Sequence, residues 1–156
     1  THVLLERGAR RVIALDVGRG QLDWQLRNDS RVVVLEGVNA RHLEAEILPF
    51  TVSLVTVDVS FISLRLIVPA LLPHSAADAV IICLVKPQFE AGRDEVGKGG
   101  IVRDERVRRQ TIDKTVRSLQ DLGLALVGLV ESPIRGQKGN LEELAVFRRR
   151  NPPAKG

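Results

Sequence analysis

The sequence has 156 residues but no methionine, no tyrosine and only 3% aromatic residues. Proteins that hold single-stranded nucleic acid regardless of sequence stack its bases on aromatic rings, so this shortage argues against such a protein. The chain opens on a pattern that is typical of the middle of a helix running into a strand. With no methionine and no recognisable signal peptide, that opening predicts a fragment whose N-terminal part is missing.

Long apolar runs are absent as well. The longest uninterrupted run, Ala79–Val85, is far shorter than the about 20 residues of a transmembrane helix, which argues against a membrane-spanning role. The one cysteine, Cys83, lies inside this run. It is expected to be a small buried hydrophobic residue in a reducing compartment, so we expect a cytoplasmic protein.

The overall charge is basic, with a formal net charge of +4 and a pI near 9.8. A basic surface fits a polyanionic partner. Arginines gather within residues 7–11, 103–109 and 148–150. Such clusters are equally typical of solvated helix faces and of a frayed tail, and the sequence leaves both interpretations open.

Apolar runs alternate with helical patterns along the chain, which predicts an α/β fold with a mostly parallel sheet and helices on both faces. The predicted strands are Arg11–Asp16, Arg31–Glu36, Ser53–Asp58, Ala79–Lys86, Leu124–Glu131 and Leu141–Arg148. The predicted helices are Gly20–Arg27, Ile62–Leu72, bent or restarted at Pro69, and Asp104–Leu122, capped by Asp104 and ended by Gly123. We expect one domain over residues 1–149 and a disordered tail at 150–156.

Three predicted strands end in a chemically active side chain: Asp16, Asp58 and Lys86. In open α/β sheets ligands bind at the carboxyl ends of the strands, and buried strands rarely carry a carboxylate without a partner or a ligand. A single strand-end aspartate often only caps the next helix, whereas three coordinated cases favour a site. Asp16 is placed where nucleotide-binding folds use an acid to accept hydrogen bonds from ribose hydroxyls.

The segment after Lys86, residues 87–103, is rich in glycine and in charge. It is predicted to be a flexible loop too polar to join the core, with Glu90 among its charges. This loop and the turn SPIRGQKGN are predicted to share the edge of the sheet on which Lys86 lies. Their backbone N–H groups and cations are of the kind that holds RNA phosphates, although simple mobile loops fit the pattern equally. The candidate RNA-binding residues are Lys98, Arg103, Arg135 and Lys138.

Several motifs resemble a known family in their order and spacing: ALDVG, GQLDWQLRND, DVSFISL, LVKPQFEAGRDEVGKGGIVRD and SPIRGQKGNLE. They are similar to motifs of the TlyA family, hemolysin-like ribosomal RNA 2′-O-methyltransferases with an FtsJ-like catalytic domain. The resemblance runs from Thr1 to about Arg149, and the long motif and DVSFISL are its most specific parts. It implies a Rossmann-like methyltransferase fold that binds S-adenosylmethionine (SAM), an S4-like RNA-binding domain upstream, and ribosomal RNA as the partner.

The resemblance also implies roles for individual residues. Asp58, Lys86 and Glu142 match the aspartate, the second lysine and the glutamate of a Lys-Asp-Lys-Glu catalytic tetrad. The implied SAM-binding residues are Asp16, which would hold the ribose, Val17, Asn39, which would bound the adenine, and Asp58. The first tetrad lysine, the first strand and the glycine-rich SAM loop would all precede Thr1. The chain is therefore expected to be an enzyme fragment that is inactive alone, and no metal site is expected.

Other interpretations remain open. Lys86 and Glu142 also fit a structural salt bridge at the sheet edge, and Glu143 competes with Glu142 because strand alternation lets only one of them face the site. An NAD(P)-dependent oxidoreductase would use the same sheet and Asp16, although no histidine is placed for its proton transfer. A non-enzymatic RNA-binding or hemolysin-like protein is the third alternative, and the sequence offers it no spanning helix and no long basic amphipathic helix.

Overall fold

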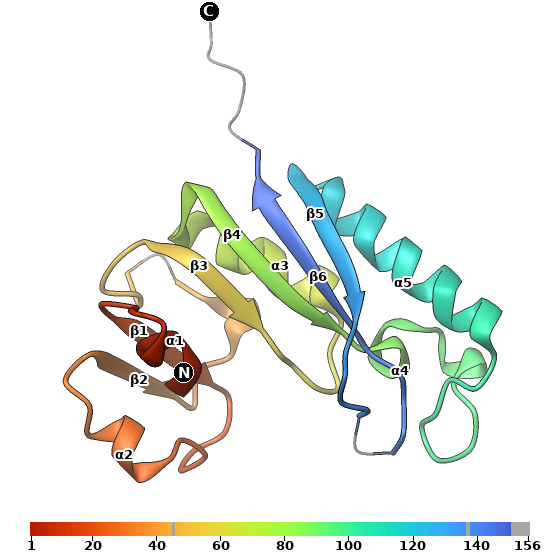
Figure 1. Cartoon of the computed structure of the whole chain (residues 1–156), viewed down its shortest axis with the longest axis horizontal. Coiled ribbons are helices and arrows are strands. Elements are labelled where there is room, and N and C mark those ends of the chain that lie inside the picture. Colours follow the sequence, from red (N-terminus) through yellow and green to blue (C-terminus); the bar gives the residue numbers. More distant parts are fainter. Residues whose placement is uncertain (45, 137, 151–156) are drawn as a thin grey trace, which may run out of the picture. The chain divides into compact units, whose positions relative to one another are not determined.

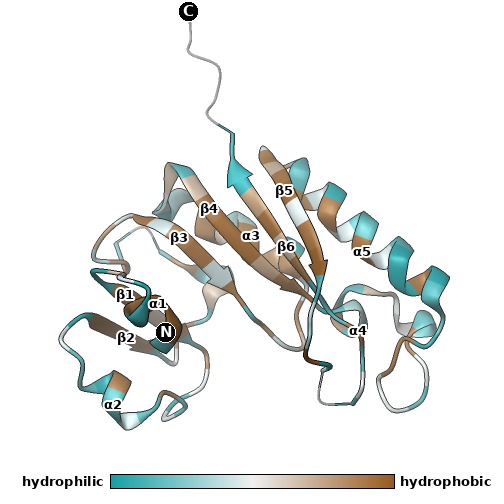
Figure 2. Ribbon diagram, viewed as in Figure 1, coloured by the Kyte–Doolittle hydropathy of each residue, from teal (hydrophilic) through white to brown (hydrophobic). Residues whose placement is uncertain are grey.

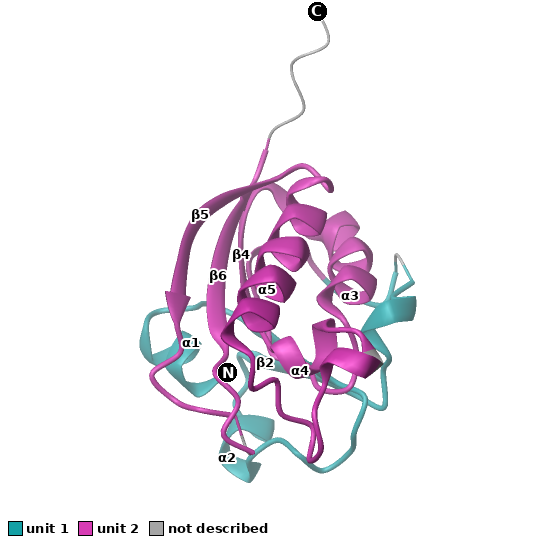
Figure 3. Cartoon of the chain, turned by 90° about the vertical axis from the view of Figure 1, so that its right-hand side faces the viewer, with its two compact units in different colours: residues 1–49 teal, residues 50–156 magenta. Residues whose placement is uncertain are grey.

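The computed structural model describes residues 1–44, 46–136 and 138–150, which form two compact units divided between residues 49 and 50 (Figure 3). The single domain expected over residues 1–149 remains a prediction. Residues 151–156 of the predicted tail lie outside the described residues. Arg150, the first residue of that predicted tail, is described, and its backbone N–H donates to the carbonyl oxygen of Gly123 at 3.0 Å.

The first unit is a small parallel βαβ arrangement (Figure 1). Its elements are α1 (His2–Glu6), β1 (Val12–Asp16), α2 (Trp24–Arg27), β2 (Val32–Glu36) and the 3-10 helix η1 (Ala40–His42). The strands β1 and β2 are parallel, and their register runs from Val12 opposite Val32 to Asp16 opposite Glu36. Both strands therefore end at the same edge, where each carries a carboxylate.

The second unit is a four-stranded sheet with helices packed on it. Its elements are β3 (Val52–Val57), α3 (Leu64–Leu71), η2 (Leu72–His74), β4 (Ser75–Val85), α4 (Pro87–Glu90), η3 (Arg93–Glu95), α5 (Glu105–Gln120), β5 (Leu124–Glu131) and β6 (Glu143–Arg149). The strand order is β3-β4-β6-β5. The strands β3 and β4 are parallel, while β6 is antiparallel to both β4 and β5.

The described strands form two sheets instead of the one sheet that was expected. The sheet of the second unit is mostly parallel, as predicted, because β3, β4 and β5 run in the same direction and β6 is reversed. In the second unit α3, α4 and α5 lie on the same face of the sheet (Figure 3). The expected cover of helices on both faces of the whole sheet remains a prediction. The strand pattern correctly located the six strands. It did not reveal that β6 runs opposite to both of its neighbours.

The core of the second unit lies between the sheet and the helices α3 and α5 that pack on it. Along β4, Ala79, Ile81, Cys83 and Val85 are fully buried, and Ile112 and Leu119 of α5 are buried as well. Figure 2 shows the hydrophobic strands of this sheet against the mixed surface of α5. The predicted burial of Cys83 is confirmed, and burial raises the pKa of its thiol to about 12, so the thiol is unreactive at neutral pH.

The helices begin and end largely where the sequence indicates. Asp104 caps α5, since its Oδ1 accepts the N–H groups of Arg106 and Val107 at 2.8 and 3.2 Å. The helix α3 continues through Pro69 and then tightens into η2 instead of restarting. None of the described helices is long and apolar enough to cross a membrane.

Candidate active site

Lys86 and Asp58 form an ion pair at one edge of the second unit. Lys86 directly follows β4 and Asp58 directly follows its parallel neighbour β3, so the sheet register brings the two side chains together. The Nζ atom of Lys86 lies 2.7 Å from Oδ1 of Asp58. The Lys86 side chain is 13% exposed and that of Asp58 is 70% exposed, so solvent reaches the pair from the aspartate side. Asp58 does not cap the next helix, because Ser63 caps α3.

Two phenylalanines lie beside this pair. Lys86 Nζ donates to Ser60 Oγ at 3.2 Å and lies 5.9 Å from the centre of the Phe89 ring. The Phe89 ring in turn contacts Phe61, with ring centres 4.9 Å apart. Phe61 is 91% exposed and has a φ of +63°, a left-handed conformation that is rare for a bulky residue. The sequence contains the motif DVSFISL but no signal for this backbone conformation.

Glu142 and Glu143 have different partners. Glu142 is 6% exposed and accepts a hydrogen bond from Gln88 Nε2 at 2.8 Å. Gly136 packs against it so closely that a Cβ there would lie 2.4 Å from Glu142 Oε1. Glu143 instead accepts from Arg108 of α5 at 2.9 Å. The structural salt bridge considered between Lys86 and Glu142 is not among the ion pairs of the described residues, where Lys86 pairs with Asp58.

A buried asparagine that the sequence did not single out joins two loops at this edge. Asn140 is 4% exposed; its Oδ1 accepts from Val102 N at 3.0 Å and its Nδ2 donates to Gly100 O at 2.9 Å. The loop after α4 therefore lies beside the loop between β5 and β6 (Figure 1). The four candidate RNA-binding side chains on these loops are exposed: Lys98, Arg103, Arg135 and Lys138. Their binding role remains a prediction.

The candidate cofactor residues of the first unit are Asp16, Val17 and Asn39, at the ends of β1 and β2. Oδ1 of Asp16 accepts from Gly18 N at 2.7 Å, and its backbone oxygen accepts from Val38 N at 3.1 Å. Backbone hydrogen bonding thus brings Asp16 and Val17 beside the turn that carries Asn39. Val17 is 70% exposed, and Asn39 Oδ1 accepts from Arg41 N at 3.0 Å.

Asp16 does not cap the helix that follows it. That helix, α2, is capped by Asp23, whose Oδ1 accepts from Gln25 N at 2.8 Å. The capping interpretation of Asp16 is therefore wrong, and the Asp16 side chain is exposed.

Glu36, at the end of β2, is a structural carboxylate that the sequence did not reveal. It accepts a hydrogen bond from the Arg27 guanidinium and further bonds from the backbone N–H groups of Gly20 and Leu22. The Arg27 bond, with these backbone bonds, lowers the pKa of Glu36 to about 2. Glu36 thereby fixes the segment between β1 and α2, next to Asp16.

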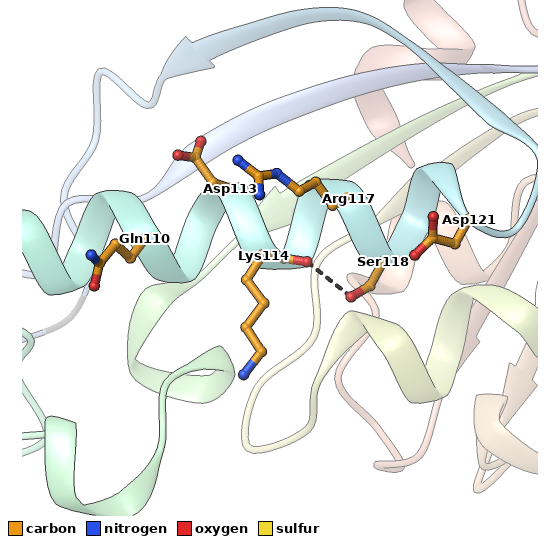
Figure 4. Close-up of a pocket in the computed structure, with 6 residues that line it drawn as sticks. All are labelled: Gln110, Asp113, Lys114, Arg117, Ser118 and Asp121. Atoms are coloured by element: carbon orange, nitrogen blue, oxygen red, sulfur yellow. Dashed lines mark hydrogen bonds between the residues drawn. The ribbon is translucent and has the colours of Figure 1, made fainter.

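A shallow hollow runs along the exposed side of α5, and none of the candidate residues lines it (Figure 4). Its lining residues are Gln110, Asp113, Lys114, Arg117, Ser118 and Asp121. The described residues contain no cluster of three side chains suited to a metal ion.

The strand order and a match to a methyltransferase family place the chain in a class of protein, the methyltransferases with a Rossmann-like fold. The structure of the N-methyltransferase NodS from Bradyrhizobium japonicum in complex with S-adenosyl-L-homocysteine superimposes with a TM-score of 0.60. That comparison covers 89% of this chain and 66% of NodS at 15% identity, so it shows the fold alone. The chain belongs to the FtsJ-like methyltransferase family, which matches residues 1–149.

Two relatives confirm the resemblance to TlyA proteins. The chain is 51% identical over 142 residues to the 16S/23S rRNA (cytidine-2′-O)-methyltransferase TlyA of Mycobacterium tuberculosis, covering 91% of this chain and 53% of that protein. A candidate hemolysin from Streptococcus thermophilus is 41% identical with a TM-score of 0.92, covering 97% of this chain and 55% of the other. The chain thus spans about half the length of these relatives.

Proposed function

We propose that the full-length protein is a cytoplasmic, SAM-dependent methyltransferase that methylates ribose 2′-hydroxyls of ribosomal RNA. The observation that carries this proposal is the Lys86–Asp58 pair, at the carboxyl ends of two parallel strands in a member of the FtsJ-like methyltransferase family. The name of the mycobacterial relative supports ribosomal RNA as the substrate.

Lys86 is the proposed acid-base residue of this reaction. SAM supplies a methyl group on a sulfonium, so the protein must hold the hydroxyl oxygen in line with that methyl and take up the hydroxyl proton. Lys86 Nζ, fixed by Asp58 and Ser60, would in its deprotonated form take up the hydroxyl proton while the ribose oxygen forms its bond to the methyl carbon and the methyl–sulfur bond breaks. Orientation supplies much of the barrier reduction, and a positioned base typically adds about 10²–10⁴-fold.

We assign Glu142 and Phe61 to the part of the proposed site that would bind the RNA substrate. Continuing the β4–β6 register past Val85 and Glu143 sets Glu142 opposite Lys86, and Gln88 holds the Glu142 carboxylate in place. The exposed Phe61 ring, packed on Phe89, offers a flat apolar face on which a nucleobase unstacked from RNA can lie. The cations of the two neighbouring loops would hold phosphates.

The cofactor residues proposed in the first unit fit a nucleoside. Asp16 uses Oδ1 for Gly18, which leaves its exposed Oδ2 to accept hydrogen bonds from ribose hydroxyls. The exposed Val17 side chain offers an apolar contact, and Asn39 has an amide NH₂ available near the turn. The proposal assigns the SAM ribose to Asp16 and the adenine to the surroundings of Asn39.

We also propose that residues 1–156 alone do not form a complete active site and that an S4-like RNA-binding domain precedes them. Within the described residues β1 has β2 as its strand neighbour and β3 has β4, so each presents a second edge on which another strand fits. The fraction of the relatives that the chain covers also supports this proposal.

One experiment separates the proposed function from its alternatives. The full-length protein is incubated with radiolabelled SAM and ribosomal subunits, and 2′-O-methylation is mapped by primer extension. Calorimetry with SAM and with NAD runs in parallel. Label in ribosomal RNA at ribose positions and saturable SAM binding are expected. Binding of NAD in place of SAM would favour the oxidoreductase, and binding of RNA without transfer would favour the non-enzymatic alternative.

Replacing Asp16 by alanine is expected to weaken SAM binding by about 1–3 kcal/mol, the scale of a charged acceptor lost from hydroxyl donors. Turnover at saturating SAM should change little, because Asp16 is assigned to the cofactor. Calorimetry on the full-length protein measures the effect. The matched control is Asp23→Ala, which removes the cap of α2 in the same unit. An unchanged dissociation constant in Asp16→Ala would remove Asp16 from the cofactor site.

A further inference from the structure

The segment Lys86–Glu90 contacts the segment after β3 at three successive levels. Lys86 pairs with Asp58 and donates to Ser60, and the ring of Phe89 packs on Phe61. The third level is Glu90, which reaches the beginning of α3. The two segments that carry the proposed catalytic pair therefore contact each other at several points. The contact farthest from Lys86 is the one made by Glu90.

Glu90 was expected in a solvated loop, and that expectation is wrong. Its side chain is 2% exposed because neutral donors from two helices surround it. Its Oε1 accepts from Leu64 N at 2.7 Å, and its Oε2 accepts from Ser63 Oγ at 2.6 Å. Thr115 of α5 adds a longer bond at 3.4 Å. A buried carboxylate is tolerated when hydrogen-bond donors replace its water, and these donors do so.

Charge pairing is not the main interaction of this carboxylate. The nearest cation is Arg65, whose Nε lies 3.8 Å from Oε2 and whose side chain is 39% exposed. The closest contacts come instead from the N-cap residue and the first residue of α3, where the helix N-terminus favours a negative charge. Glu90 therefore fixes where α3 begins relative to α4.

The geometry points to Glu90 as a positioning residue for the proposed methyl transfer, one that sets the spacing of Lys86 and Asp58 without touching substrate. The inference rests on the proposed function. Lys86 precedes α4 and Asp58 lies in the segment leading to α3, so a bond between α4 and the start of α3 determines how far apart the two can move. Hydrogen bonds specify this spacing more narrowly than apolar packing of the same volume, because they require particular atoms to meet.

The test compares Glu90→Ala, Glu90→Gln and Ser63→Ala in the full-length protein, with Ser75→Ala as the control. Ser75 is a buried serine at the opposite end of β4 that donates to Leu71 O at 2.8 Å. Single-turnover methyl transfer at saturating SAM and RNA separates the amplitude, which reports the folded fraction, from the rate constant, which reports the geometry of the reacting groups. Calorimetry gives the SAM affinity of each variant.

The rate constant is expected to fall about 10- to 100-fold in Glu90→Ala, the scale of a misplacement of about 1 Å. SAM affinity should stay unchanged, Glu90→Gln should lose less because it keeps one acceptor oxygen, and Ser75→Ala should keep the wild-type rate constant. If Glu90→Ala does not fold, the proposal requires that Ser63→Ala and Glu90→Gln each lower the rate constant. The double variant should then raise the activation free energy by less than the sum of the two single increases. A reduced amplitude with a wild-type rate constant would overturn the proposal.

Hydrogen exchange distinguishes a failure of this inference from a failure of the proposed function. Glu90→Gln is expected to speed amide exchange over residues 58–64, and Ser75→Ala is expected not to. Should the wild-type protein transfer no methyl group, the proposed function fails while the exchange result still tests the Glu90 contact. Unchanged exchange over residues 58–64 would overturn the positioning role in either case.

Discussion

Lys86→Ala is expected to abolish measurable methyl transfer by the full-length protein while leaving SAM affinity nearly unchanged. Loss of a positioned acid-base group typically costs about 10²–10⁴-fold, and Asp58 loses its ion-pair partner in the same step. Unfolding is not the expected cause. The Asp58 side chain is 70% exposed, and ion pairs open to water contribute little to stability. Radiolabel transfer and calorimetry on one preparation measure both quantities.

Two further variants make the Lys86 result specific. Lys86→Arg keeps the positive charge beside Asp58 but does not release its proton near neutral pH, so it should also be inactive if Lys86 takes up a proton. Lys114→Ala removes an exposed lysine of α5 and should behave as wild type. Activity near the wild-type level in Lys86→Arg would show that the positive charge beside Asp58 suffices and that Lys86 takes up no proton. Wild-type activity in Lys86→Ala would remove Lys86 from the reaction.

Residues 1–156 expressed alone are expected to show neither saturable binding of SAM at micromolar concentrations nor methyl transfer. The candidate SAM residues Asp16 and Asn39 stand on a two-stranded sheet, and two strands without further cover are marginally stable. The burial of these strands is consistent with marginal stability, because apolar residues of β1 and β2 such as Ile13 and Val33 are only half-buried. A cofactor site needs a more rigid support than this.

Calorimetry with SAM is run on the 156-residue chain and on the full-length protein, with circular dichroism as the check that both contain folded material. Saturable micromolar binding by the short chain would show that the cofactor site is placed wrongly in the first unit or that β1 and β2 suffice to hold it. Binding by neither chain would count against the proposed function as a whole.

Strand positions were predictable because strand and helix periodicities differ, and the ends of β1, β3 and β4 placed Asp16, Asp58 and Lys86 correctly. The pair of Asp58 with Lys86 follows from the same logic, since neighbouring parallel strands end at one edge. The direction of β6 was not predicted. β6 lies between β4 and β5 and is antiparallel to both, and its pairing with β4 joins residues about 60 positions apart in the chain.

The helix α4 and the burial of Glu90 escaped prediction for a related reason. The four residues of α4, Pro87–Glu90, show no periodic pattern, and charged residues in loops are usually solvated. Glu90 is buried only because Ser63 and Leu64 on one side and Thr115 on the other supply its donors. Such a site exists only after the chain has folded, and no local pattern records it.

The left-handed backbone at Phe61 has a consequence for how this chain balances stability against function. Glycine adopts a φ of +63° without steric penalty, whereas a residue with a side chain loses about 1–2 kcal/mol there. Because the ring is 91% exposed, its burial returns little of that loss. A sequence optimised for folding alone would carry glycine at this position. Phe61 therefore lowers the stability of the fold at a position where its ring packs on Phe89 beside Lys86.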